Sequence, residues 1–89
     1  MTAPEARRAL REVVGPGGEL AFTKHARVEM GKDRLESTDV TNILRGGIVD
    51  EPEWENGAWR YHVRTQRIEV VVEFRGPKSA VVVTAWRLS

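Results

Sequence analysis

Two arginines and one histidine alternate along a single stretch of the chain, as Arg60, His62 and Arg64. Successive side chains of a β-strand point to opposite faces of a sheet, so this spacing places all three on one face. Guanidinium groups bind phosphate through paired hydrogen bonds, and a histidine can give or take a proton near neutral pH. The row therefore predicts a phosphate-binding surface on which His62 acts as a general acid or base.

The same row also has a purely structural interpretation. If Gln66-Arg67 forms a two-residue hairpin loop, Arg64 faces Glu69 and Arg60 faces Glu73 on the next strand. Opposite charges at such positions form an exposed ladder of ion pairs, in which each pair contributes little to stability. The histidine between the two arginines faces a valine, and the ladder does not explain it.

Other residues are candidates for the same chemistry. His25 lies four residues before Glu29 in an expected helix, so it is either a second acid or base or a surface histidine bonded to that carboxylate. Thr84 either serves a site or is simply a β-branched residue in a strand. Trp86 and Trp59 either stack on nucleic-acid bases or pack against the protein.

Several kinds of chemistry are not readable in this sequence. It shows no serine–histidine–aspartate arrangement, no pair of catalytic carboxylates and no metal-binding motif, and it has no cysteine for disulfides or thiolate zinc sites. We therefore expect no cofactor and no metal. Acid–base catalysis assisted by arginine remains, and RNA cleavage is its simplest form. The 2′-hydroxyl is an internal nucleophile that needs only orientation, proton transfer and charge stabilisation.

Three helices are expected in the first half of the chain. Each starts at a hydroxyl side chain that can cap its first turn: Thr2, Thr23, and Ser37 or Thr38. The first helix ends at the glycine-rich loop 15–18, the second runs from Lys24 to about Gly31, and the third stops at Gly46-Gly47.

The second half of the chain has the pattern of β-structure. A short strand is expected near 48–51, followed by three longer strands joined by tight turns, at 59–65, 68–74 and 80–88. A chain of 89 residues makes a single domain, here 1–89. The expected fold is α+β, with two or three N-terminal helices packed on a four-stranded, mostly antiparallel sheet.

The register of the strands decides which side chains share a face. If the second turn places Phe74 opposite Ser79, two further pairs follow: Thr84 with Glu69, and Trp86 with Arg67. One face then carries a charged and polar set, namely Arg60, His62, Arg64, Glu69, Glu73, Thr84 and Trp86. The opposite face is the core side and carries Tyr61, Val63, Val70 and Val72.

Charge is unevenly distributed, although the net charge is only +1. Residues 1–58 carry 8 basic and 11 acidic side chains, a balance of −3, and residues 59–89 carry 6 basic and 2 acidic ones, a balance of +4. The segment 50–55 holds four acids and no base, so it would repel a nucleic acid. No apolar run is long enough for a membrane span and no signal peptide is readable, so a cytoplasmic location is expected.

A series of short blocks forms a pattern: His25-Ala26-Arg27, Met30, Arg34-Leu35, Asp39-Val40, Ile43-Leu44, Gly47, Trp59-Arg60-Tyr61, Ile68–Val72 and Val82–Trp86. These blocks resemble a small bacterial domain family of unknown function. The resemblance extends over residues 22–88 and leaves the first helix, 1–14, as an addition. That family is itself similar to MqsR and RelE, toxin ribonucleases of the barnase–EndoU–colicin–RelE fold, whose genes often lie beside antitoxin genes.

The resemblance implies a compact α+β fold and metal-independent cleavage of RNA, with a cognate antitoxin as protein partner. Carried over residue by residue, the family's site falls on His25, Arg27, Arg34, Tyr61 and Thr84. The chain departs from the family at Glu29, where a basic residue is frequent, and at Trp86, where tyrosine is usual. The expected register places Tyr61 on the core face instead, which favours a structural role unless the sheet edge or a bulge brings it to the site.

We therefore expect a metal-independent endoribonuclease toxin. Its residues would be His25, His62, Arg64 and Thr84 for catalysis, and Arg27, Arg60, Tyr61 and Trp86 for substrate binding. The alternative is a non-catalytic module that binds a protein through the open sheet face and the segment 50–55, or binds RNA without cleaving it. The near-neutral net charge favours the protein-binding module.

Overall fold

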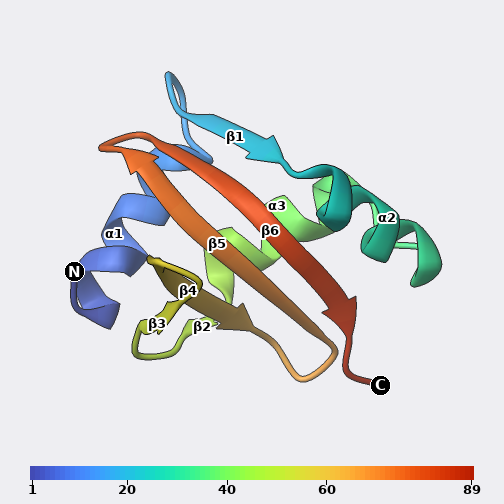
Figure 1. Cartoon of the computed structure of the whole chain (residues 1–89). Helices are drawn as coiled ribbons and strands as arrows, with labels where there is room; N and C mark the ends of the chain where they lie inside the picture. The colour runs from blue at the N-terminus through green and yellow to red at the C-terminus, as the bar shows by residue number, and fades with distance from the viewer.

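The computed structural model describes all residues, 1–89. Figure 1 shows its helices and strands, which are in chain order α1 (Ala3–Val13), β1 (Glu19–Phe22), α2 (Lys24–Lys32), α3 (Ser37–Gly46), β2 (Ile48–Val49), β3 (Glu53–Glu55), β4 (Ala58–Arg64), β5 (Ile68–Gly76) and β6 (Ser79–Arg87). The fold is α+β as expected, but the sheet has six strands and not four. None of the helices combines the length and the apolar character that crossing a membrane requires.

The sheet is mixed, with strand order β1-β6-β5-β4-β2, and β3 also pairs with β4. β1 runs parallel to β6, and every other pair is antiparallel. β1 and β3 are the two strands that the sequence analysis did not expect. A strand of three or four residues is too short to show alternation, and parallel pairing between the beginning and the end of a chain leaves no local pattern.

Capping explains where the helices begin. Thr2 caps α1 and the hydroxyl of Thr23 caps α2, as expected. α3 begins differently, because Glu36 occupies the N-cap position and neither hydroxyl of residues 37–38 caps the helix. The backbone N–H of Glu36 donates to the carboxylate of Asp39 at 2.8 Å, which closes the first turn.

The register between β4 and β5 agrees with the expectation. Arg64 lies opposite Glu69, and His62 lies opposite Val71. The loop at 66–67 is therefore the two-residue connection that the sequence suggests, and it fixes which side chains of β4 and β5 share a face.

The expected register between β5 and β6 is wrong. Thr84 pairs with Val71 instead of Glu69, and Trp86 pairs with Glu69 instead of Arg67. Both strands extend further into the turn than expected, and the pairing shifts at two irregular points in β5. The displacement at Thr84 and Trp86 is two residues, so both stay on the face that the sequence assigned to them. Between the two irregular points the displacement is one residue, so Val82 pairs with Val72 and lies in the core, although the expected register would place it opposite Val71.

Helices cover only one face of the sheet. Figure 1 shows α1 and α3 behind the sheet and α2 at its margin beside β6. Buried side chains of the three helices meet those of the sheet in one core cluster, which includes Ala6, Leu10, Met30, Val40, Leu44, Tyr61, Val63, Val70, Val72, Val82 and Ala85. We call the uncovered side the outer face; it bears Arg60, His62, Arg64, Glu69, Glu73, Thr84 and Trp86.

Candidate functional site

The outer face gathers five of the predicted site residues in cross-strand rows. One row is formed by His62, Val71 and Thr84, and the next by Arg64, Glu69 and Trp86. Neighbouring strands lie about 4.8 Å apart, so the backbone of His62 lies about 10 Å from that of Thr84. With Arg60, these residues form one half-buried surface.

His62 is held between two carboxylates. Its Nδ1 lies 2.8 Å from Oε2 of Glu69 on β5, and its Nε2 lies 3.0 Å from Oε2 of Glu55 on β3. Burial lowers the pKa of His62, but the hydrogen bonds and the charges of Glu69 and Glu55 raise it more, so the pKa lies above its ordinary value of 6.5. The bond with His62 in turn lowers the pKa of Glu55. This arrangement favours a protonated imidazole that clamps three strands together.

The two arginines of the row are paired as well. Arg60 donates from Nε to Glu73 at 3.0 Å, as the ladder interpretation predicts. Arg64 was expected to pair with Glu69, but its guanidinium binds both oxygens of Asp50 at 2.9 and 3.2 Å. The carboxylate of Glu69 is hydrogen-bonded to His62 instead of Arg64. Asp50 is available to Arg64 because it follows the edge strand β2, which pairs with β4. These carboxylates occupy part of each guanidinium group and place negative charge where a phosphate would bind.

The β3–β4 hairpin adds a group that the sequence analysis missed. Glu53, Glu55 and His62 each offer one ligand atom, and these atoms lie within 4.8 Å of one another, so the group could hold a divalent metal ion. Asn56-Gly57 was the readable signal, because this dipeptide between two short β-prone runs is the strongest local indication of a hairpin. The φ angles of Asn56 and Gly57 are 48° and 81°, and the type I′ turn that this dipeptide favours requires positive φ at both positions.

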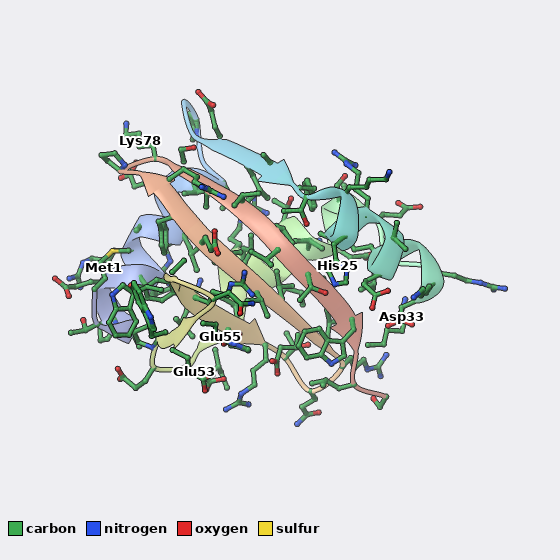
Figure 2. All side chains as sticks on the ribbon, in the orientation of Figure 1. Met1, His25, Asp33, Glu53, Glu55 and Lys78 are labelled. Atoms are coloured by element: carbon green, nitrogen blue, oxygen red, sulfur yellow. The ribbon has the colours of Figure 1, made fainter.

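His25 lies apart from this network. It is exposed in the first turn of α2, and no ion pair or side-chain hydrogen bond engages its imidazole. Glu29, its expected partner, instead binds Lys32 at 2.7 Å. The backbone N–H of Thr23 donates to the carbonyl of Val82 at 3.0 Å, which holds the start of α2 against β6. Figure 2 shows His25 below α2, beside this strand.

The structure does not bring Arg27 together with His25. Side chains two residues apart diverge by about 200° around a helix, so the two lie on different sides of α2. The guanidinium of Arg27 lies 5.0 Å from the ring centroid of Phe22, and that ring packs against the core. Arg34 follows α2, exposed and with a φ of 56°. The arginines predicted to bind phosphate, on α2 and on β4, therefore do not form a single phosphate-binding site.

Tyr61 lies on the inner face, where it is only 3% exposed. Its hydroxyl donates to the carbonyl of Met1 at 3.4 Å, and its ring packs edge-on against Phe74. Burial raises the pKa of Tyr61. The sheet separates this residue from Thr84 and Trp86, so Tyr61 lies on the core face, as the expected register predicts.

A family described as a domain of unknown function (DUF4258) matches residues 22–87. The chain belongs to this family. The matched region runs from the end of β1 to the end of β6 and includes every predicted site residue. No curated protein and no solved structure matches the chain. The family match carries no link to MqsR or RelE, so the resemblance to those toxins stays a hypothesis.

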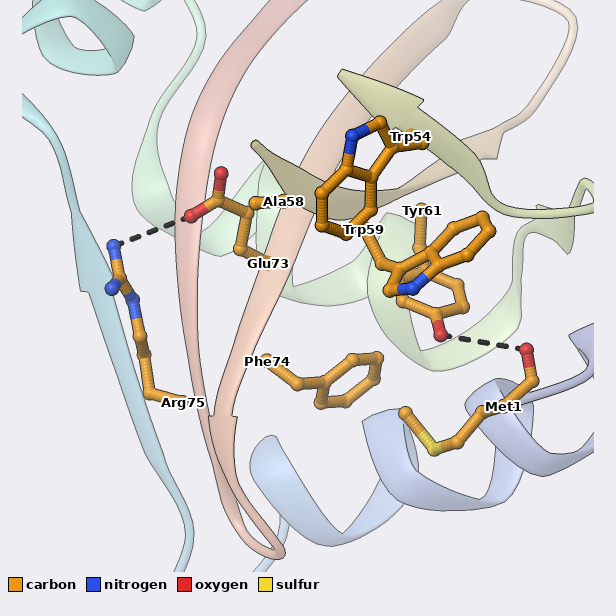
Figure 3. Close-up of a pocket in the computed structure, with 8 residues that line it drawn as sticks. All are labelled: Met1, Trp54, Ala58, Trp59, Tyr61, Glu73, Phe74 and Arg75. Atoms are coloured by element: carbon orange, nitrogen blue, oxygen red, sulfur yellow. Dashed lines mark hydrogen bonds and ion pairs between the residues drawn. The ribbon is translucent and has the colours of Figure 1, made fainter. Parts of the chain in front are cut away.

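This DUF4258 protein also has a pocket of about 430 Å³ that the sequence did not indicate (Figure 3). Its lining consists of Met1, Trp54, Ala58, Trp59, Tyr61, Glu73, Phe74 and Arg75. Met1 precedes the residues that the family matches, whereas the aromatic residues all lie within them. Trp59, a candidate for base stacking or for packing, is 54% exposed, and its ring lies edge-on to that of Trp54 with centroids 5.4 Å apart.

Proposed function

We propose that this protein is a metal-independent endoribonuclease of the toxin type, and that RNA binds at the margin between α2 and β6. The position of His25 carries the proposal. It is an exposed histidine without a carboxylate partner, beside the strand that bears Thr84 and Trp86. His62, the other predicted acid or base, is engaged at both ring nitrogens.

The distribution of charge supports this margin as the place for RNA. Residues 24–34 carry four basic and two acidic side chains, a balance of +2, whereas residues 50–55 carry four acids and no base, a balance of −4. A polyanion is attracted to the first segment and repelled by the second. α2 borders β6 and the acidic segment borders β4, with β5 between those two strands.

In the proposed reaction, the 2′-oxygen attacks the adjacent phosphorus and the bond from phosphorus to the 5′-oxygen breaks. The products are a 2′,3′-cyclic phosphate and a 5′-hydroxyl. His25 takes the proton of the 2′-hydroxyl and gives it to the leaving 5′-oxygen. The hydroxyl of Thr84 donates a hydrogen bond to the phosphate, and the indole of Trp86 stacks on a base.

Expression from a tightly repressed promoter tests this function. We expect growth arrest with rapid loss of mRNA on induction, and we expect His25→Ala to abolish both while the circular dichroism spectrum stays that of the wild type. Arg64→Ala should retain cleavage, because Arg64 is paired with Asp50 away from the margin. Arg8→Ala, an exposed change on α1, is the matched control. Intact RNA in the wild type, or unchanged cleavage by His25→Ala, would contradict the proposal.

A second candidate function is a non-catalytic binding module. The observation in its favour is that the carboxylates of Asp50, Glu55, Glu69 and Glu73 engage the cationic groups of the outer face, which leaves that face without free positive charge. Normal growth together with binding of purified protein to RNA would indicate an RNA-binding domain. Normal growth without RNA binding would indicate a protein-binding one. A neighbouring gene for a small DNA-binding antitoxin would favour the toxin.

A further inference from the structure

Two tryptophans of the β3–β4 hairpin are far more exposed than tryptophan usually is. Trp54 is 61% exposed and Trp59 is 54% exposed, and Met1 beside them is 51% exposed. The two indoles lie opposite each other in the hairpin, with ring centroids 5.4 Å apart. Contiguous exposed apolar side chains of this size mark interaction surfaces more often than isolated ones do.

Behind the two indoles lies the pocket shown in Figure 3. Its deeper part is formed by Tyr61 and Phe74, whose rings meet edge-on with centroids 5.1 Å apart. A volume of about 430 Å³ is large enough for a bulky side chain and part of its backbone. The aromatic pocket therefore suits an apolar side chain that projects from another molecule.

The charge around Trp54 is negative and only partly neutralised. Asp50 is paired with Arg64, and Glu55 with His62. Glu51 is exposed and in no ion pair, and the carboxylate of Glu53, 67% exposed, comes no closer than 4.0 Å to His62. These two carboxylates would attract lysine or arginine and repel a phosphate backbone.

The backbone of β3 is also available. β3 pairs only with β4, so its second edge has no partner strand. An extended peptide can add to such an edge through main-chain hydrogen bonds. The faces of β3 differ: Trp54 projects toward the pocket, whereas its neighbours Glu53 and Glu55 project toward His62 on the outer face. A peptide strand added here would need the same alternation.

We propose that the free edge of β3, together with the aromatic pocket, binds an extended basic segment of a partner protein. Its apolar side chains enter the pocket beside Trp54 and Trp59, and its lysines or arginines face Glu51 and Glu53. This surface lies at the β4 margin of the sheet, across β5 from the proposed RNA site on β6. The proposal therefore does not depend on RNA cleavage.

Titration calorimetry with a synthetic peptide tests the proposal. The probe is acetyl-KVKLKVK-amide, in which lysine alternates with apolar residues. The controls are acetyl-EVELEVE-amide, with reversed charge, and acetyl-KSKSKSK-amide, without apolar side chains. We expect only the probe to bind, with a Kd below about 1 mM that weakens at high salt. In a Trp86→Phe background the emission of Trp54 and Trp59 should shift on binding, since these are then the only tryptophans.

Two variants test separately how the aromatic pocket and the acidic residues contribute to peptide binding. Trp54→Ala and the double variant Glu51→Lys/Glu53→Lys should each weaken binding by about tenfold or more. Glu19→Lys, an exposed change on β1 at the other end of the sheet, should leave it unchanged. RNA cleavage by Trp54→Ala should equal that of the wild type, which keeps the two proposals distinguishable.

Three outcomes would overturn the proposal. The first is equal binding of the acidic control peptide, or no binding of the probe up to about 1 mM. The second is a dimer in light scattering that Trp54→Ala abolishes, because the surface would then be occupied by a second copy of the chain. The third is binding of single-stranded RNA that depends on Trp54, which would make the pocket a base-stacking site.

Discussion

At the scale of single residues, His62 connects three strands of the sheet through its two ring nitrogens. It lies on β4 and meets a carboxylate on β5 through one ring nitrogen and a carboxylate on β3 through the other. A neutral imidazole has only one N–H donor, whereas the protonated form donates from both nitrogens. The clamp is therefore complete only when His62 carries a proton.

Stability should follow this protonation. Because the folded pKa of His62 is raised above its ordinary value of 6.5, its contribution is fully present below 6.5 and is lost as pH rises through the folded pKa. Because the folded pKa of Glu55 is lowered from 4.5, its contribution is present above 4.5 and is lost as pH falls through the folded pKa. We expect the loss of unfolding free energy in His62→Gln to be larger at pH about 6 than at pH about 9.

Urea unfolding of both proteins across this range measures the difference directly. His25→Gln is the matched control, since His25 is exposed and in no ion pair. A loss in His62→Gln that stays constant from acid to alkaline pH would show that the ion pairs of His62 do not contribute to stability.

The membership of the outer face could be predicted at this scale, and so could the pair of Arg60 with Glu73, but the partners of His62 and Arg64 could not. Alternation along β4 placed Arg60, His62 and Arg64 together, and the structure agrees. Asp50 and Glu55, which bind two of them, lie on edge segments whose pairing with β4 depends on how the chain folds back between β2 and β3. Local spacing carries no information about the contact of Asp50, whereas Asn56-Gly57 indicated the hairpin that brings Glu55 to His62.

At the scale of elements, the local sequence predicted where helices and strands lie better than it predicted how the strands pair. The extents of α1, α2 and the three long strands follow from caps, periodicity and turns, and they were nearly correct. The β5–β6 register was wrong because irregular pairing within a strand has no clear signature in its residues. β1 was missed because only its parallel partner at the other end of the chain defines it.

Two glycines give opposite predictions for these elements. Gly57 has a φ of 81° in the β3–β4 turn, so Gly57→Ala should destabilise the protein by about 1 kcal/mol through backbone strain. Gly31 lies within α2, and a Cβ there would meet nothing within 4 Å. Gly31→Ala should therefore stabilise the protein by about 0.5–1 kcal/mol.

Chemical denaturation of the two variants checks this contrast. Open space surrounds both positions, so the sign of the effect reports on the backbone and not on packing. A Gly57→Ala variant as stable as the wild type would contradict the tight turn, and with it the position of Trp54 over the pocket.

At the scale of the whole molecule, the matched family region is not the whole folding unit. The match begins at residue 22, yet α1 places Ala6 and Leu10 in the core with no exposure. Arg7 donates to the carbonyls of Leu44 and Arg45 at 2.6 and 3.1 Å, where α3 ends. α1, which lies outside the residues that match the family, thus completes the helical layer behind the sheet, and its Arg7 caps the end of α3.

Deleting residues 1–17 should therefore abolish cooperative unfolding, although it removes nothing from the family region. Burial of Leu10 alone is worth about 2–5 kcal/mol, measured as Leu10→Ala, and small domains are stable by only about 5–15 kcal/mol. Arg11→Ala, an exposed change on the same helix, should cost less than about 0.5 kcal/mol. Thermal melting followed by circular dichroism distinguishes these cases. If the truncated chain melts in one sharp transition close to that of the full protein, α1 is dispensable and the core closes without it.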